Sequence, residues 1–218
     1  MMKNALLRRD LGRWAAAAAL ALGASTGLVR PALAADEAPD ALVKRLSTEV
    51  LDTIKADATI KAGDVGRIMQ LVDSKIMPNV NFQRMTAATV GPAWRQATPE
   101  QKQRLQDEFK QLLVRTYAGA LDQVSDQTVV IKPFRGSPTD QEVLVRTEVR
   151  GRGEPVQLDY RLEKTPGQGY GWKVYNLNVM GVWLVDTYRT QFAQEINSKG
   201  IDGLIATLAE RNKSGAKS

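Results

Sequence analysis

The sequence predicts an α+β fold: an antiparallel sheet of four strands, or five, covered on one face by a helical layer. Three observations support this fold class. Segments with apolar residues at helical spacing come first, up to about residue 124. Segments with alternating apolar and polar residues follow, separated by turns that contain Gly and Pro. The stretch 170–200 then changes from strand spacing to helical spacing, so it can join the last strand to a helix.

Three amphipathic helices are predicted before residue 92. The first covers 40–57, the second runs from the N-cap residue Asp64 to Pro78, and the third covers 81–90. Their apolar faces are Leu42, Leu46, Val50 and Ile54; Val65, Ile68, Met69, Val72 and Ile76; and Phe82, Met85 and Val90.

A longer helix is predicted from Thr98 to about Val124. Thr98 is placed at the N-cap, Pro99 at the first helical position and Gln101 two residues later, which together form a capping box. The buried stripe of this helix is predicted to be Leu105, Phe109, Leu112, Leu113, Thr116, Tyr117, Ala120 and Val124.

Four strands are predicted next, at 128–134, 141–150, 154–164 and from 170 onward. Short turns between them indicate antiparallel hairpins with one dry face and one wet face. The predicted inward positions are Val143, Val145, Thr147 and Val149; Val156, Leu158, Tyr160 and Leu162; and Trp172 and Val174.

Helical spacing resumes after Gly181. Val185, Tyr188, Phe192 and Ile196 form one face, and Gly200 is predicted to end the helix. A last helix follows, and residues 212–218 are predicted to be a disordered tail. Large apolar side chains on both layers fit either an ordinary filled core or the walls of a cavity for an apolar ligand, and the pattern alone leaves both open.

Composition excludes several kinds of chemistry. The 218 residues include no His and no Cys. Ser-His-Asp or Cys-His catalysis, zinc held by His or Cys, haem with its usual ligands and disulfides are therefore excluded. Metals with oxygen ligands remain chemically open, but no loop has the corresponding ligand spacing. We therefore predict no metal and no cofactor.

Residues 1–34 have the features of a cleaved export signal. A basic start is followed by an Ala-rich apolar stretch that is too short for a membrane span, and Ala32 and Ala34 fit a small-x-small cleavage site. Arg8 and Arg9 fit the twin-arginine route and the general secretory route equally well. The mature chain would then be a single domain, 35–211, exported without a lipid anchor.

The basic charge belongs mainly to this signal. Residues 1–34 hold five of the 30 basic and one of the 24 acidic residues, which leaves 25 and 23 in the mature chain, a net charge of +2. Nucleic-acid binding requires a strong basic footprint. No nucleic-acid partner is therefore expected.

Three blocks of sequence resemble the MlaC family of periplasmic phospholipid carriers, also called toluene-tolerance auxiliary proteins. They are 78–101 (PNVNF to GPAWRQATPEQ), 156–162 (VQLDYRL), and 172–204 (WKVY to GV, YRTQF and KGIDGL). Their order and spacing cover nearly the whole mature chain. The resemblance implies a soluble, monomeric, non-enzymatic carrier in the periplasm, with bound phospholipid as its ligand.

The resemblance also implies partners and a cellular role. A carrier of this family shuttles lipid between an outer-membrane lipoprotein (MlaA-like) with a porin and an inner-membrane MCE-type ABC transporter complex (MlaD-like). That exchange maintains outer-membrane lipid asymmetry. The family holds the acyl chains between sheet and helices and leaves the headgroup near solvent.

Carried onto this sequence, the resemblance makes the inward positions the lipid-binding wall. The residues expected from the sheet are Val143, Val145, Leu158, Tyr160, Trp172 and Val174. Those expected from the helices are Val72, Ile76, Phe82, Met85, Leu112, Leu113, Tyr117, Val185 and Tyr188. Arg95 and Arg189 are candidates to meet a headgroup phosphate.

Two other function classes remain open at this level. One is an exported enzyme acting on lipids or glycans through a carboxylate pair such as Glu108 and Asp122, although no nucleophile motif accompanies the pair. The other is a periplasmic chaperone or adaptor whose apolar groove holds a protein segment.

Overall fold

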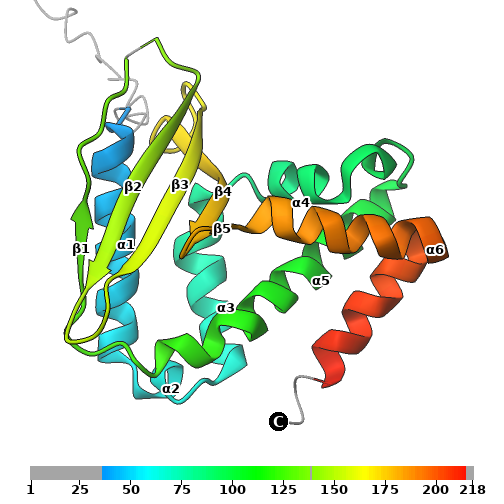
Figure 1. The fold of residues 1–218 in the computed structure, drawn as a ribbon, viewed down its shortest axis with the longest axis horizontal. Helices are drawn as coiled ribbons and strands as arrows, with labels where there is room; N and C mark the ends of the chain where they lie inside the picture. The colour runs from blue at the N-terminus through cyan, green and yellow to red at the C-terminus, as the bar shows by residue number, and fades with distance from the viewer. Residues whose placement is uncertain (1–35, 138, 215–218) are drawn as a thin grey trace, which may run out of the picture. The chain divides into compact units, whose positions relative to one another are not determined.

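Five antiparallel strands form one sheet, and their order in the sheet is their order in the chain (Figure 1). The structure is a computed structural model that describes residues 36–137 and 139–214. Each strand pairs with its sequence neighbour, as the alternating pattern and short turns predicted. The strands are β1 (Thr128–Ile131), β2 (Glu142–Arg150), β3 (Val156–Lys164), β4 (Trp172–Val179) and β5 (Val182–Trp183).

A bulge in β4 keeps apolar side chains on the inner face of the sheet. Leu162 pairs with Val174, whereas Arg161 pairs with Asn176, so Tyr175 is an extra residue in β4. An extra residue reverses the alternation beyond it. Val174 and Leu177 therefore lie on the same face, although they are three positions apart in the chain.

Helix α1 (Pro39–Ala56) lies behind the sheet in Figure 1 and packs against its inner face. Leu42 and Val43 of this helix form one buried cluster with Val143, Val145 and Trp172 of the sheet. This end of the sheet–helix interface is filled by side chains, and Val145 has 0% exposure.

A second core lies among helices α4 (Phe82–Val90), α5 (Pro99–Ala118) and α6 (Leu184–Ser214). Phe109 is at its centre, with ring centroids 5.1 Å from Tyr188 and 5.3 Å from Phe192. Both pairs are edge-to-face, a favoured geometry for aromatic rings. Much of the helical layer is thus stabilised by contacts among helices, and Leu177 and Val179 of β4 pack against the same core.

A third core closes the opposite end of α1. It joins Ile54 of α1 to Ile60 of α2 (Ala58–Lys61), Ile68 of α3 (Val65–Leu71) and Val114 of α5. After α3 the chain continues as a π-helix, Val72–Ile76, and a 3-10 turn, Met77–Asn79.

The predicted start of α5 is confirmed and its predicted end is wrong. The Thr98 hydroxyl accepts from the Gln101 N–H, and the Gln101 side chain accepts from the Thr98 N–H, as the capping box requires. The helix ends at Ala118 and is followed by a 3-10 turn, Gly119–Leu121. Gly119 at the C-cap favours this end, because Gly is a poor residue for a helix interior.

Gly200 interrupts α6, as predicted, with φ 69°. Helical structure resumes at once and reaches Ser214, so the predicted tail at 212–218 is wrong for residues 212–214. Asn212 is buried, and its side-chain amide donates to the Glu108 backbone oxygen at 3.0 Å and to Glu108 Oε2 at 2.7 Å. The predicted signal 1–34, the cleavage site and residues 215–218 lie outside the described residues.

A polar network fastens the start of α4 to the outer side of the sheet. The Arg84 guanidinium contacts Glu142 of β2 at 2.6 Å and also pairs with Glu163 of β3. It lies 3.7 Å from the ring centroid of Tyr175, whose hydroxyl donates to Glu142 at 2.8 Å. These contacts hold α4 at a fixed position beside β4.

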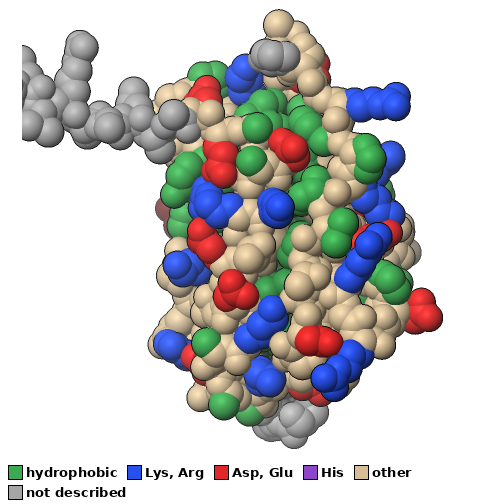
Figure 2. Space-filling view, turned by 90° about the vertical axis from the view of Figure 1, so that its left-hand side faces the viewer, with side chains coloured by type: hydrophobic (Ala, Val, Ile, Leu, Met, Phe, Trp, Pro, Cys, Tyr) green, Lys and Arg blue, Asp and Glu red, His purple; other side chains and the backbone are tan. Residues whose placement is uncertain are grey.

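Acidic and basic side chains are intermixed on the face shown in Figure 2. Glu148 pairs with Lys132 and, at 2.6 Å, with Arg150, while Arg152 pairs with Asp126 at 3.3 Å.

In the described part of the chain, no helix is both long enough and apolar enough to cross a membrane.

Candidate functional site

A cavity of about 330 Å³ lies between the inner face of the sheet and helices α1, α5 and the π-helix. Its lining is predominantly apolar. Nine of the residues predicted from the sequence line it: Val72, Ile76, Phe82, Met85, Leu113, Tyr117, Leu158, Tyr160 and Val174. The predicted space between sheet and helices is therefore present, and contact of these residues with lipid is a proposal developed below.

The π-helix builds one wall. Its wide turn is closed by the Met77 N–H donating to the Val72 oxygen, and Val72, Lys75 and Ile76 all line the cavity. Single π turns are often found at functional sites. The chain that follows is fastened to β4, because the Asn81 N–H donates to the Val174 oxygen at 2.8 Å. Wall and sheet are thus held together at one edge.

The sheet contributes Tyr160 with a satisfied hydroxyl. The Tyr160 hydroxyl lies 3.2 Å from the Ser47 hydroxyl of α1, within hydrogen-bond distance. Burial raises the pKa of Tyr160, since a phenolate would lose its hydration. The side chain stays neutral at physiological pH, so it presents an apolar ring and one weakly polar atom to the cavity.

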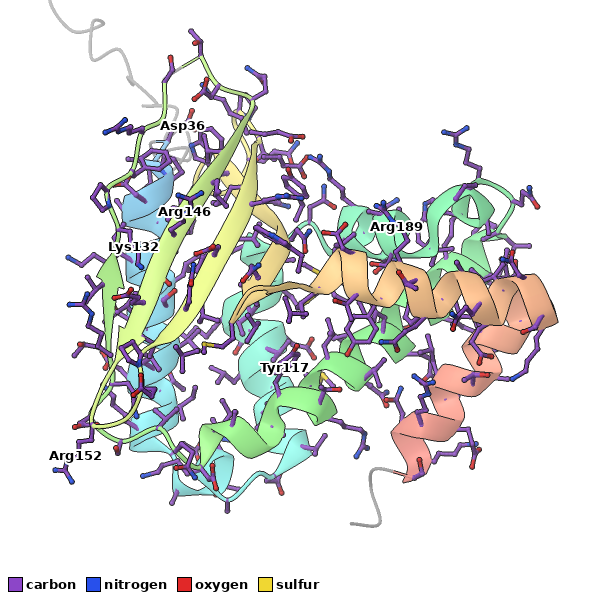
Figure 3. All side chains as sticks on the ribbon, in the orientation of Figure 1. Asp36, Tyr117, Lys132, Arg146, Arg152 and Arg189 are labelled. Atoms are coloured by element: carbon purple, nitrogen blue, oxygen red, sulfur yellow. The ribbon has the colours of Figure 1, made fainter. Side chains whose placement is uncertain are left out.

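Tyr117 of α5 faces the cavity from the helical side. It lies where α5 passes α3 (Figure 3). Burial, and to a smaller degree the nearby Tyr188, raises the pKa of Tyr117. This phenol is also neutral, so neither tyrosine can act as a general base near pH 7.

Six predicted wall residues do not line this cavity. Val143, Val145 and Trp172 are covered by α1, which packs directly onto that end of the sheet. Val185 and Tyr188 are buried in the α4–α6 core, and Leu112 packs against the same core. The physical reason is common to all six: an inward-facing apolar residue borders a cavity only where the opposing layer leaves space.

Sequence reasoning misses wall residues from α1 and from β4. Leu46 and Val50 lie on the predicted apolar stripe of the first helix, outside the set of expected wall residues, and both line the cavity. Their i, i+4 spacing was the available signal. Leu177 was missed because the bulge in β4 is not visible in the alternation.

The predicted headgroup residues lie elsewhere. Arg95 is exposed at the end of the 3-10 turn Gly91–Arg95 and does not line the cavity. The Arg189 guanidinium donates to the Ala88 backbone oxygen at 2.9 Å, so it lies beside α4 (Figure 3). Two lysines, Lys75 and Lys110, line the cavity instead.

The carboxylate pair considered for an enzyme lies outside the cavity. Among the described residues that line it there is no carboxylate. Neither Glu108 nor Asp122, the pair considered for an enzyme, lies in the lining, and Glu108 accepts a hydrogen bond from Asn212. No cluster of three or more acidic, His or Cys side chains that could hold a metal ion occurs in the described ranges.

Comparison with known proteins identifies relatives of this chain. A curated relative, toluene tolerance protein ttg2D of Pseudomonas putida, is 26% identical over 169 residues, which is 77% of each chain. Another is the intermembrane phospholipid transport system binding protein MlaC of Haemophilus influenzae, 23% identical over 185 residues, 84% of this chain and 86% of that protein.

A solved structure is more similar. A phospholipid-binding protein from Ralstonia solanacearum, determined in complex with a phospholipid, is 50% identical and has a TM-score of 0.77. The match covers 81% of this chain and 98% of that one. The model of the MlaC protein family matches residues 44–210, which include all five strands and nearly all of the helices described above. This chain belongs to the MlaC family.

Proposed function

We propose that this protein is a carrier that holds phospholipid acyl chains in the cavity between its sheet and its helices. One observation carries the proposal: the cavity is apolar and its described lining has no carboxylate. The phospholipid bound to the Ralstonia protein, at 50% identity, supports the same ligand class here. We infer that the protein binds lipid without chemical conversion.

The energetics favour a closed carrier. Two acyl chains contain on the order of 30 methylenes, and exposing each to water costs ~0.8 kcal/mol, roughly 25 kcal/mol in all. A carrier must therefore cover both chains during transit and release them only while docked. A bilayer stabilises the chains nearly as well as the cavity does. The direction of transfer must then come from partners, since the sequence has no phosphate-binding motif of the GxxxxGK[ST] type.

The nine lining residues predicted from the sequence form the proposed lipid wall, together with Leu46, Val50 and Leu177. The cavity volume of about 330 Å³ is at the lower end of the range for ordinary ligand sites. A loaded state with two chains therefore needs a wider cavity. The π-helix wall is the segment best placed to move, because single π turns are rare in proteins and are often found at functional sites.

We propose the periplasm as the site of action. The partners would be an outer-membrane lipoprotein complex (MlaA-like) and an inner-membrane MCE-type ABC transporter (MlaD-like), and their exchange of lipid would maintain outer-membrane asymmetry. Cleavage after Ala34 is part of this proposal. N-terminal sequencing of protein from a periplasmic extract should begin at Ala35, and a mature protein that still carries Trp14 would contradict it.

Mass spectrometry of lipid extracted from the purified protein tests the ligand class. We expect intact phospholipid at a fixed ratio to protein. Lipid breakdown products would indicate an enzyme, and a co-purifying peptide in place of lipid would indicate the adaptor function. Protein from which no lipid is extracted, and which takes up none from vesicles, would refute the carrier.

A further inference from the structure

The cavity has two charged residues in its described lining, and both are lysines. Lys75 belongs to the π-helix and Lys110 to α5. The two elements are joined directly, because Lys110 Nζ lies 2.8 Å from Asp73 Oδ1 of the same π-helix. Lys75 and Lys110 therefore approach the cavity from two adjacent walls.

Lys75 marks a place where the cavity reaches solvent. Its side chain is exposed and also lines the cavity. The side-chain amide of Asn79, another lining residue, donates to the Lys75 backbone oxygen at 2.9 Å, which ties the backbone at this point. A ligand whose apolar part fills the cavity would have its polar end beside Lys75.

The local charge is unbalanced. Lys110 has a carboxylate partner in Asp73, whereas no carboxylate in the described ranges forms an ion pair with Lys75. Lys75, Lys110 and Asp73 together carry a net charge of +1. A phosphodiester carries one negative charge and has two free oxygens, so it matches this edge in charge and in number of acceptors.

We propose that Lys75 and Lys110 form a phosphate-binding site at the open edge of the cavity, which receives the phosphodiester of a lipid headgroup. The inference rests on the proposed function and adds to it the group by which the polar end of the ligand is held. Lys75 is exposed and the Lys110 side chain is 23% exposed. Solvent therefore weakens the charge interaction, so the site selects lipids that carry a phosphate and does not bind a free anion tightly.

Two probes with the same acyl chain isolate the phosphate contact. Delipidated protein is offered an equimolar mixture of 1-oleoyl-lysophosphatidylglycerol and 1-oleoylglycerol, and the ratio of the two bound lipids is measured by mass spectrometry. The double variant Lys75→Gln, Lys110→Gln should lower this ratio about tenfold, which corresponds to about 1.4 kcal/mol. Each single variant should lower it less, and added salt should lower the wild-type ratio toward that of the double variant.

Lys44→Gln is the matched control. Lys44 is an exposed lysine of α1 that does not line the cavity, so this change removes one charge and leaves the site intact. The ratio for Lys44→Gln should equal that of the wild type. Thermal melting of each variant confirms that the fold is kept.

The outcomes separate this inference from the proposed function. If neither probe binds the wild type, the carrier proposal fails. If both probes bind but the double variant keeps the wild-type ratio, the carrier stands and the phosphate site is wrong. Inorganic phosphate is titrated separately into delipidated protein. If it binds the wild type and not the double variant, while the lipid ratio is unchanged, the lysines form a free-phosphate site and the headgroup assignment is overturned.

Discussion

Replacing Leu158 or Val145 with tryptophan distinguishes a cavity wall from a filled core. Both residues lie on the inner face of the sheet, on neighbouring strands. Leu158 lines the cavity, whereas Val145 has 0% exposure and packs under α1. The same substitution thus meets open space at one position and close-packed side chains at the other.

The expected magnitudes differ. An indole ring is larger than benzene, which needs a cavity of about 150 Å³, and it is larger than the leucine side chain that it replaces, so Leu158→Trp should fill part of the 330 Å³. We expect little loss of stability and a clear loss of bound lipid. At Val145 the indole overpacks the core, which costs ~1–3 kcal/mol or more. For a chain of this size that lowers the melting temperature by about 2–4 °C per kcal/mol.

The assay measures two quantities on each purified variant: lipid per protein by mass spectrometry, and melting temperature. Leu158→Trp should lose lipid and keep its melting temperature, while Val145→Trp should melt earlier and keep lipid in the folded fraction. The reasoning is refuted if Leu158→Trp melts as early as Val145→Trp while its lipid content stays at the wild-type level.

Three further predictions concern stability. An empty, rigid cavity of about 330 Å³ would cost roughly 8 kcal/mol at about 24 cal/mol per Å³, a large part of a typical stability of ~5–15 kcal/mol. Gentle delipidation should therefore lower the melting temperature and raise amide exchange first in the π-helix. Identical melting curves for loaded and delipidated protein would contradict a ligand-stabilised cavity. Hydrogen bonds from Arg84 and Tyr175 hold the pKa of Glu142 below its usual 4.5. Ionised Glu142 therefore adds stability at pH values above 4.5, and this contribution is lost as the pH falls through the lowered pKa. Melting curves of the wild type and Glu142→Gln should differ at pH 7 and converge at lower pH; a difference that does not depend on pH would count against this pairing. Gly200→Ala should destabilise by ~1–3 kcal/mol, because φ 69° with ψ −174° is a conformation that essentially only glycine adopts. Gly119→Ala, at φ −65° with open space around it, should stabilise by ~0.4–1 kcal/mol. Chemical denaturation measures both changes, and equal effects would show that backbone conformation is not the cause.

Local features of the sequence determined much of the fold. The capping box at Thr98, the alternation along β2 and the glycine at position 200 each depend on interactions within a few residues. Because each strand also pairs with its neighbour in the chain, the sheet order followed from the same local turns. The inward faces of the strands could be predicted for this reason.

Tertiary structure alone decided which inward residues border the cavity. Val145 and Leu158 are equivalent in pattern, yet one is covered by α1 and the other faces open space. The headgroup prediction shows the same limit: Arg95 and Arg189 lie away from the cavity, while Lys75 and Lys110 line it. Whether a side chain meets a partner or a space depends on elements distant in the chain, so the cavity could not be located from the periodicity of any single segment.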